Sequence, residues 1–404
     1  MTVGLLITLV VVLLLVLLAI RMPVALALAL SGITGLYFLR GDAEYVTNQL
    51  GSIPFTQTNS FSLTIVPMFI LMGVFAVRAR IAEQVYAVAR LASRRLPGGL
   101  AVATVMACAG FAAVSGSSIG TAATMSRLSV GEMRKAGYPA SFAGATVAVA
   151  GTLGVLIPPS LFLVLYAIIT RESVGAMLAS GIIPGILSAC AYIAYILVVA
   201  RKNKEKWAAL AQGERQSGFA ADVQGDPQDV LELHGIAKRE AQAATETLEP
   251  VEYMRMNADE LRMRDLPLRG VVRVGILFLI VLGGLYSGLF TATESAAMGA
   301  LTAAIMLVWE FRRDGVKAVT SNVVEALKET AGTTSMVFAI VVGSGILSAF
   351  FISARLPQMV TDWASGLGLN PYLTLGALLL LLVPSAWPLT HYRFSSSQCH
   401  SSTR

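Results

Sequence analysis

The sequence is short of charge. Asp, Glu, Lys and Arg make up 13% of its 404 residues, about half of their usual share in soluble domains. Even this charge is unevenly spread, because residues 201–270 hold 24 of the 54 charged side chains, 11 basic and 13 acidic. The other 334 residues are too apolar for a soluble domain, since apolar residues make up 55% of the chain. The composition predicts a membrane-embedded protein with one polar insert.

Cysteine and histidine are also scarce, with three of each. Cys108, Cys190 and Cys399 show no metal-ligand spacing with the histidines, so we expect no metal centre of this kind. Cys108 and Cys190 lie in apolar segments, where a free thiol behaves as a small packing residue.

Asp and Lys are missing from the apolar segments. An intramembrane protease needs a Ser/Lys or paired-Asp arrangement at membrane depth, which argues against that enzyme class. The net charge of +6 does not indicate nucleic acid, because basic pairs such as residues 94–95, 201–202 and 312–313 stand at the ends of apolar runs. The positive-inside rule puts basic residues there.

The apolar segments predict an all-α polytopic membrane protein. Residues 4–20 have no charged leader and are followed by a second run, so we expect them to form the first span of the mature protein rather than a signal peptide. Glycines and prolines at 151, 154, 158–159, 181 and 184–185 predict bent or discontinuous helices. The runs are residues 4–20, 24–39, 63–77, 100–114, 142–169, 174–200, 271–290, 295–309, 333–352 and 372–383.

Residues 115–118 (Ser-Gly-Ser-Ser) interrupt the chain where a span is expected. The run before them, 100–114, is shorter than the ~20 residues that a spanning helix needs. Another small-residue run, 119–125, follows them. Irregular backbone at membrane depth must be buried in protein or line a cavity, and secondary transporters hold substrates and ions at such breaks. The sequence predicts a re-entrant hairpin around residues 100–128 and a broken helix around 142–169.

Residues 80–95 alternate charged side chains with apolar ones at helical spacing, which predicts an amphipathic helix lying in the membrane interface. A cytosolic helix is the alternative. The segment also belongs to a weak internal repeat, in which residues 67–73, 80–95 and the run from 100 correspond to residues 335–343, 355–360 and the run from 372. Repeated halves are common in secondary transporters.

The chain divides into four regions on these grounds. Residues 1–200 form a first membrane half, 201–270 a polar insert, 271–383 a partial second half and 384–404 an aberrant polar tail. The basic count places the insert on the cytoplasmic side. The tail has no periodicity, and we expect a frameshift or truncation near Val383, with a genuine polar tail as the alternative.

Several of these motifs together are specific to one family. The chain resembles the large membrane subunit (DctM-like) of tripartite ATP-independent periplasmic (TRAP) transporters, over roughly residues 1–200 and 271–383. The stretches that carry the resemblance are residues 110–118, 121–125, 132–133, 151–160, 181–185 and 284–297.

The resemblance implies an inverted-repeat, elevator-type transporter with a helical hairpin and broken helices, in the bacterial inner membrane. It implies sodium as coupling ion, no other cofactor, and import of an organic acid such as a C4-dicarboxylate. Its implied partners are a periplasmic solute-binding protein (DctP-like) and a small membrane subunit (DctQ-like). In two departures from the family, the insert is long and the second hairpin is missing. The alternatives are a binding-protein-independent sodium/dicarboxylate carrier, or an inactive truncated product.

The chemistry of residues 115–118 agrees with an ion site. Hydroxyl and carbonyl oxygens suit sodium as a hard cation, and the helix that begins at Ile119 directs its positive end toward a substrate carboxylate. The predicted sodium ligands are Ser115, Gly116, Ser117, Ser118, Gly151 and Thr152, and the predicted substrate residues are Thr121, Pro158, Pro159 and Ser160. Small-residue helix packing is the alternative role for the serines.

Glu294 lies between two apolar runs. An acid inside a membrane is usually functional, so a proton- or ion-binding role is one hypothesis. An acid in the first turn of a helix, favoured by the helix dipole, is the other.

Overall fold

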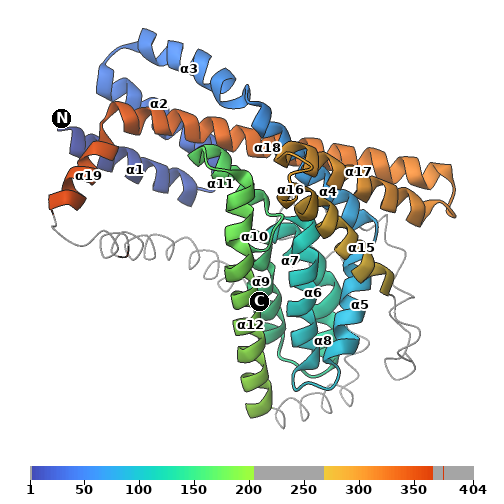
Figure 1. Ribbon diagram of the computed structural model, residues 1–404. Helices are drawn as coiled ribbons and strands as arrows, with labels where there is room; N and C mark the ends of the chain where they lie inside the picture. The colour runs from blue at the N-terminus through green and yellow to red at the C-terminus, as the bar shows by residue number, and fades with distance from the viewer. Residues whose placement is uncertain (1, 204–267, 367–375, 377–404) are drawn as a thin grey trace, which may run out of the picture. The chain divides into compact units, whose positions relative to one another are not determined.

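The structure is a computed structural model that describes residues 2–203, 268–366 and 376 (Figure 1). Every regular element in these ranges is helical, and five helices are long and apolar enough to cross a membrane, or six if one bent pair counts as a span. The predicted all-α polytopic membrane fold is confirmed. The chain forms two compact units, residues 60–335 and residues 1–59 with 336–404, so the first predicted half contributes to both.

The unit of residues 1–59 and 336–404 is built on close helix contacts. It contains α1 (Val3–Ala19), α2 (Val24–Arg40), α3 (Ala43–Thr58), the end of α18 (Val316–Ser353) and α19 (Leu356–Gly366). Leu36 and Phe350 are completely buried in its core. A Cβ at Gly32 would lie 2.7 Å from the backbone nitrogen of Leu347, so glycine lets α2 and α18 touch there.

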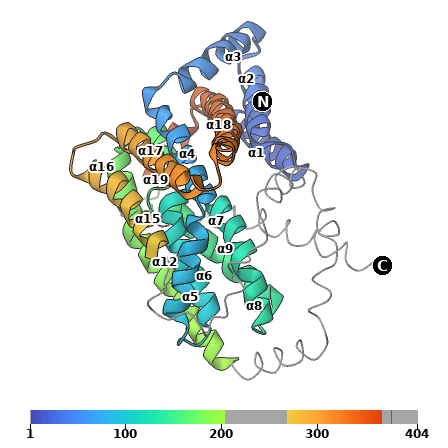
Figure 2. The same ribbon diagram turned by 90° about the vertical axis from the view of Figure 1, so that its right-hand side faces the viewer.

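The unit of residues 60–335 begins with a short turn and a buried helix. The chain runs through η1 (Phe61–Thr64), α4 (Ile65–Arg78), α5 (Ile81–Ser93), α6 (Gly99–Ser115), α7 (Ser118–Met125), the π-helical turn η2 (Ser126–Val130) and α8 (Gly131–Lys135). Helices α7 and α8 return along α6 and form a helical hairpin (Figures 1 and 2). An ion pair of 3.0 Å between Arg90 of α5 and Glu132 of α8 ties the hairpin's second arm to α5.

The second part of this unit contains a bent helix and the helices that follow it. Helices α9 (Ala140–Gly151), α10 (Leu153–Leu156) and α11 (Leu161–Thr170) form one path that bends by 42°. Next come α12 (Val174–Lys202), α15 (Leu268–Phe278), the π-helical turn η6 (Leu279–Gly283), α16 (Gly284–Tyr286), α17 (Ala292–Phe311) and the first part of α18. The Ser295 hydroxyl of α17 donates to the Val281 carbonyl inside η6, where the wide turn interrupts regular α-helical bonding.

Helix α5 corrects one prediction. Its apolar face does not lie free for a membrane interface, because Ile81, Val85 and Ala89 are buried and the helix packs on α6 and α15. The amphipathic pattern gave the helix and its apolar face correctly. A periodic pattern does not say whether protein or lipid covers that face.

Helices α12 and α18 differ from expectation in continuity. Pro184 lies inside α12, which runs over 29 residues, so the helix predicted to be bent or discontinuous there is continuous. Neighbouring groups can satisfy the carbonyl that a membrane proline leaves free. Helix α18 covers 38 residues and begins well before the apolar run at 333. Its first part is polar, so a search for apolar runs does not detect it.

The proposed repeat has a local counterpart in the backbone. Arg80 separates α4 from α5 in the left-handed conformation with φ 57°, and Arg355 separates α18 from α19 with the same φ. Both junctions therefore contain a left-handed arginine. The run at 372–383 apart from residue 376, most of the insert (204–267) and the tail at 384–404 lie outside the described residues.

Candidate functional site

The hairpin tip, residues 115–118, is a helix end followed at once by a helix start. Helix α6 ends at Ser115, and Gly116 takes a left-handed conformation with φ 59°, the usual glycine stop for a helix. The Ser117 side chain then caps α7 by accepting a hydrogen bond of 3.2 Å from the backbone N–H of Gly120. The break thus follows from a local glycine stop and serine start.

The second interruption, residues 157–160, lies between α10 and α11 and is called the Pro-Pro break. Pro158 and Pro159 have no N–H to continue a helix, and both are buried. Ser160 is fully buried and caps α11; its hydroxyl accepts weakly from the N–H of Leu163 at 3.5 Å and donates to the carbonyl of Val155 at 2.6 Å.

The two interruptions touch each other. The backbone N–H of Leu161 donates a 3.1 Å hydrogen bond to the carbonyl oxygen of Gly116. A Cβ on Gly116 would lie 2.8 Å from the carbonyl oxygen of Pro159, and one on Gly154 would lie 2.9 Å from the carbonyl of Ser117. Glycine at both positions therefore permits two irregular backbone segments to approach to contact.

Two hydroxyl groups stand inside this contact. The oxygens Oγ of Ser115 and Oγ1 of Thr121 are 2.8 Å apart, and both residues are buried. Either hydroxyl can be the donor of this hydrogen bond, and the other then accepts. Ser118, the first residue of α7, is half-buried.

Gly151 and Thr152 contact residues next to the hairpin tip and the Pro-Pro break, and no contact of theirs with Ser115 or Thr121 is among those described. A Cβ on Gly151 would lie 2.7 Å from that of Ala122, so Gly151 seats α9 against α7. The exposed Thr152 donates at 2.7 Å to the carbonyl of Val149 in its own helix and lies 3.4 Å from the Tyr192 hydroxyl. The chain leaves the helix over several residues only at the Pro-Pro break, which begins five residues after Thr152 because the prolines lie there.

Gly73 of α4 also belongs to the surroundings of the tip, although the sequence gave only a weak signal for it. A Cβ at this position would lie 2.6 Å from the carbonyl oxygen of Ser115. The signal is a lone glycine inside an otherwise large-residue apolar helix, where it is unfavourable without a packing reason.

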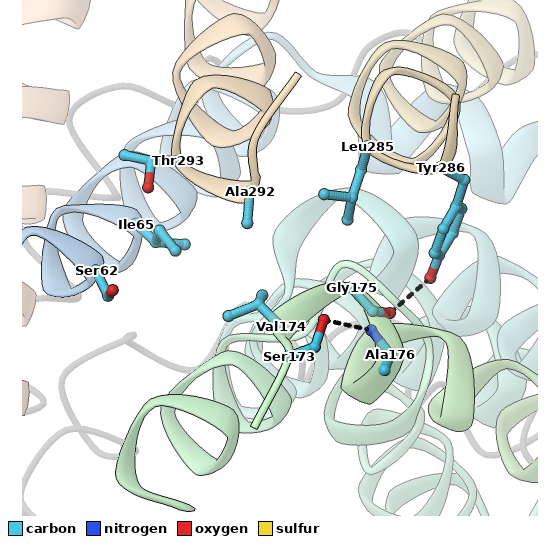
Figure 3. A pocket seen from close by; sticks show the side chains of 10 residues that line it. All are labelled: Ser62, Ile65, Ser173, Val174, Gly175, Ala176, Leu285, Tyr286, Ala292 and Thr293. Atoms are coloured by element: carbon cyan, nitrogen blue, oxygen red, sulfur yellow. Dashed lines mark hydrogen bonds between the residues drawn. The ribbon is translucent and has the colours of Figure 1, made fainter. Parts of the chain in front are cut away.

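An open pocket of about 570 Å³ lies elsewhere in the same unit, where η1, α12 and α17 begin (Figure 3). The Tyr286 hydroxyl donates to the Gly175 carbonyl at 3.2 Å beside it. None of the predicted ion or substrate residues lines it. Its lining residues are Ser62, Ile65, Ser173, Val174, Gly175, Ala176, Leu285, Tyr286, Ala292 and Thr293.

Glu294 takes the helix-start role. Its carboxylate accepts from the Thr291 N–H at 2.8 Å and from the Thr291 hydroxyl at 2.9 Å, while the Thr291 hydroxyl accepts from the Glu294 N–H at 3.3 Å. This reciprocal pair is a capping box at the start of α17. The carboxylate is thereby engaged in holding the helix end.

Comparison with known proteins decides the family. The profile of the family described as "Tripartite ATP-independent periplasmic transporter, DctM component" matches residues 11–391. The chain belongs to this family. It is therefore a multi-pass membrane protein of a transporter permease family.

Several relatives of this DctM-family chain carry transporter names. The C4-dicarboxylate TRAP transporter large permease protein DctM of Pseudomonas aeruginosa is 28% identical over 379 residues, which are 90% of this chain and 76% of the relative. Its namesake in Vibrio cholerae is 30% identical over 87% of this chain and 71% of the relative. The sialic acid TRAP transporter large permease protein SiaM of Vibrio cholerae is 28% identical over 88% and 69%.

Proposed function

We propose that this chain is the large membrane subunit of a sodium-coupled TRAP transporter that imports an organic acid delivered by a solute-binding protein. The observation that carries the proposal is the hydrogen bond between Leu161 and Gly116, which joins the hairpin tip to the Pro-Pro break. Secondary transporters bind at facing helix interruptions of this kind, and the family consists of transporter permeases.

The groups at the tip fit sodium by their donor chemistry. Hard cations take oxygen ligands, including backbone carbonyls. Ser115 supplies a hydroxyl, and the last carbonyls of α6 lack helical donors except that of Ala112, which accepts from the Gly116 N–H at 3.0 Å. Residues 116–118, with Gly151 and Thr152 nearby, are the other proposed sodium residues.

The same contact offers groups for a carboxylate. Helices α7 and α11 both begin here, and a helix start favours a negative group. Thr121, Pro158, Pro159 and Ser160 are the proposed substrate residues. The hydrogen bond between Ser115 and Thr121 places an ion group next to a substrate group, which supports coupling between the two ligands.

We infer the substrate class from the names of the relatives. The names of the three relatives described above specify C4-dicarboxylates and sialic acid, which are both carboxylates. A C4-dicarboxylate-like acid is the substrate that we propose. The chain then acts as a carrier rather than an enzyme, in the bacterial inner membrane, beside a DctQ-like small subunit and a DctP-like binding protein.

Reconstitution tests this function. The chain, its small subunit and its binding protein are placed in liposomes, and uptake of labelled succinate is measured with an inward sodium gradient and with choline instead. We expect uptake that needs both sodium and the binding protein. Ser115→Ala should abolish it, whereas Ser180→Ala, which removes an exposed hydroxyl from α12, should not. Equal uptake in sodium and choline would contradict sodium coupling, and uptake without the binding protein would contradict the tripartite assignment.

A further inference from the structure

The hairpin tip has a wall that belongs to neither helix interruption. Helix α4 passes the end of α6, and Gly73 is buried at the crossing. A Cβ on Gly73 would lie 2.6 Å from the carbonyl oxygen of Ser115 and 3.3 Å from its carbonyl carbon and Cα. All three atoms are backbone atoms, so no side-chain rotation can relieve the overlap.

Helix α4 is packed against a second helix and anchored at its end, which limits how far it can move from the tip. It packs along α17, and Ile65, Phe69 and Met72 of α4 are all buried. Its end is fixed by Arg78, which pairs with Glu325 at 2.7 Å and with Glu329 at 3.1 Å on α18. Both partners lie in the same unit as α4.

The tip is the part that must yield if Gly73 gains a side chain. Ser115 is the last residue of α6, and its neighbour Gly116 continues into the non-helical part of the hairpin tip. A shift of Ser115 changes the 2.8 Å contact between its hydroxyl and that of Thr121, and it moves the Gly116 carbonyl that accepts from Leu161. Oxygens that hold an ion must stay in place to within a fraction of an ångström.

We propose that Gly73 of α4 is a positioning residue for the hairpin tip: it sets the place of the Ser115–Gly116 backbone and thereby the tip's affinity for sodium. This inference rests on the proposed function. It adds a residue and a helix that touch the tip only from outside.

Gly299 of α17 provides a matched comparison where α17 packs against α4. A Cβ there would meet the Met72 sulfur at 2.6 Å and the Val281 Cγ2 at 2.7 Å. Both are ends of side chains, and that of Met72 is flexible. Gly299→Ala therefore perturbs the packing of the same helix without pressing on the tip backbone. Gly144→Ala of α9, where a Cβ meets nothing within 4 Å, controls for the substitution itself.

The test measures sodium binding and stability separately. The purified chain is unfolded by heat in detergent at rising sodium chloride, with choline chloride keeping the ionic strength constant. The readouts are the melting temperature in choline and the sodium concentration that gives half of the stabilisation. A merely structural role lowers the first and leaves the second unchanged.

We expect Gly73→Ala to raise the half-saturating sodium concentration about tenfold, a factor that corresponds to about 1.4 kcal/mol of binding free energy. Gly299→Ala and Gly144→Ala should stay within about twofold of the unchanged chain. If Gly73→Ala fails to fold, Gly154→Ala replaces it, because its Cβ would press on the Ser117 carbonyl from α10.

Two results would overturn the inference, and they differ. An unchanged sodium midpoint in Gly73→Ala, with a lower melting temperature in choline, would reduce Gly73 to a packing residue while the sodium site stands. A chain that sodium does not stabilise at all, in any variant, would remove the proposed sodium coupling together with the positioning role.

Discussion

Helices α4 and α12 are both apolar enough to span a membrane, yet they lie in opposite surroundings. Protein buries 56% of the span that contains α4 and only 11% of that of α12. Helix α12 leaves Ile183, Leu187 and Tyr195 largely exposed. Hydropathy records that a side chain avoids water, and it does not distinguish protein from lipid.

Glycines mark the faces that contact protein on both helices. Gly73 of α4 meets the hairpin tip, while Gly181 and Gly185 of α12 meet Leu156 and Ile157 at the Pro-Pro break. Helix α4, which is largely buried, therefore supports the hairpin tip through one glycine. Helix α12, which is largely exposed, supports the region of the Pro-Pro break through two glycines on a face that contacts protein.

The largest expected effect separates the two helices directly. Phe69→Ala on α4, where the ring is 4% exposed, should lower the free energy of unfolding by about 3–5 kcal/mol. Leu187→Ala on α12, where the side chain is 68% exposed, should lower it by less than about 0.5 kcal/mol. Denaturant unfolding in detergent measures both, and similar losses would contradict the difference in burial.

The next prediction concerns the stability contributed by the glycine face of α12, which contacts protein as α4 does. A Cβ on Gly181 would overlap the Leu156 carbonyl oxygen, so Gly181→Ala should destabilise the protein by about 1–3 kcal/mol. Gly175→Ala on the same helix, with no atom nearer than 3.8 Å to its Cβ, is the control and should be close to neutral. Unfolding curves that coincide for both variants would show that the contact with the break is not tight.

A smaller effect concerns the charged end of α4. Arg78→Met removes the pairs with Glu325 and Glu329, which are partly exposed, and should cost about 1–2 kcal/mol. The loss should shrink in about 1 M salt because exposed charges are screened. Arg201→Met at the exposed end of α12 is the control. A salt-independent loss would point to lost packing rather than lost pairing.

The smallest effect is a pH dependence beside α4. Burial raises the pKa of Glu83 in α5, the Arg80 charge opposes this shift, and the Glu310 charge adds to it. The folded protein therefore keeps a proton that the unfolded chain has already lost, so stability should fall as pH rises from the ordinary glutamate range through the raised pKa. Arg273 of α15, which is 9% exposed, pairs with Glu310.

Melting temperatures across this pH range check the sign for Glu83. Glu83→Gln should flatten the slope, whereas Glu44→Gln, at an exposed position of α3, should leave it as it was. An equal slope with and without the Glu83 carboxyl would assign the pH dependence to another group.

At the hairpin, local signals in the sequence are enough to predict the interruption of the helix. A glycine after a small-residue run and a serine that can cap are enough to suggest an interruption at residues 115–118, where α6 ends and α7 begins. Composition alone gives the all-α membrane class, and grouped motifs give the family.

Contacts between distant residues could not be predicted in this way. Gly73 and Ser115, or Gly116 and Leu161, come together only through the packing of whole helices. The same holds for the cover of α5, since its periodicity is the same for a protein partner and for a lipid surface. Pro184 does not interrupt α12, because a proline removes one backbone donor and a membrane helix can tolerate that loss.

The chemistry of the tip has an electrical consequence. Residues 115–121 contain hydroxyls, carbonyls and glycine, and no ionised side chain. A membrane voltage does work only on moving charge, about 2.3 kcal/mol per unit charge per 100 mV. An empty tip therefore presents no full charge to the voltage, and at these residues the bound ion or substrate supplies the full charge.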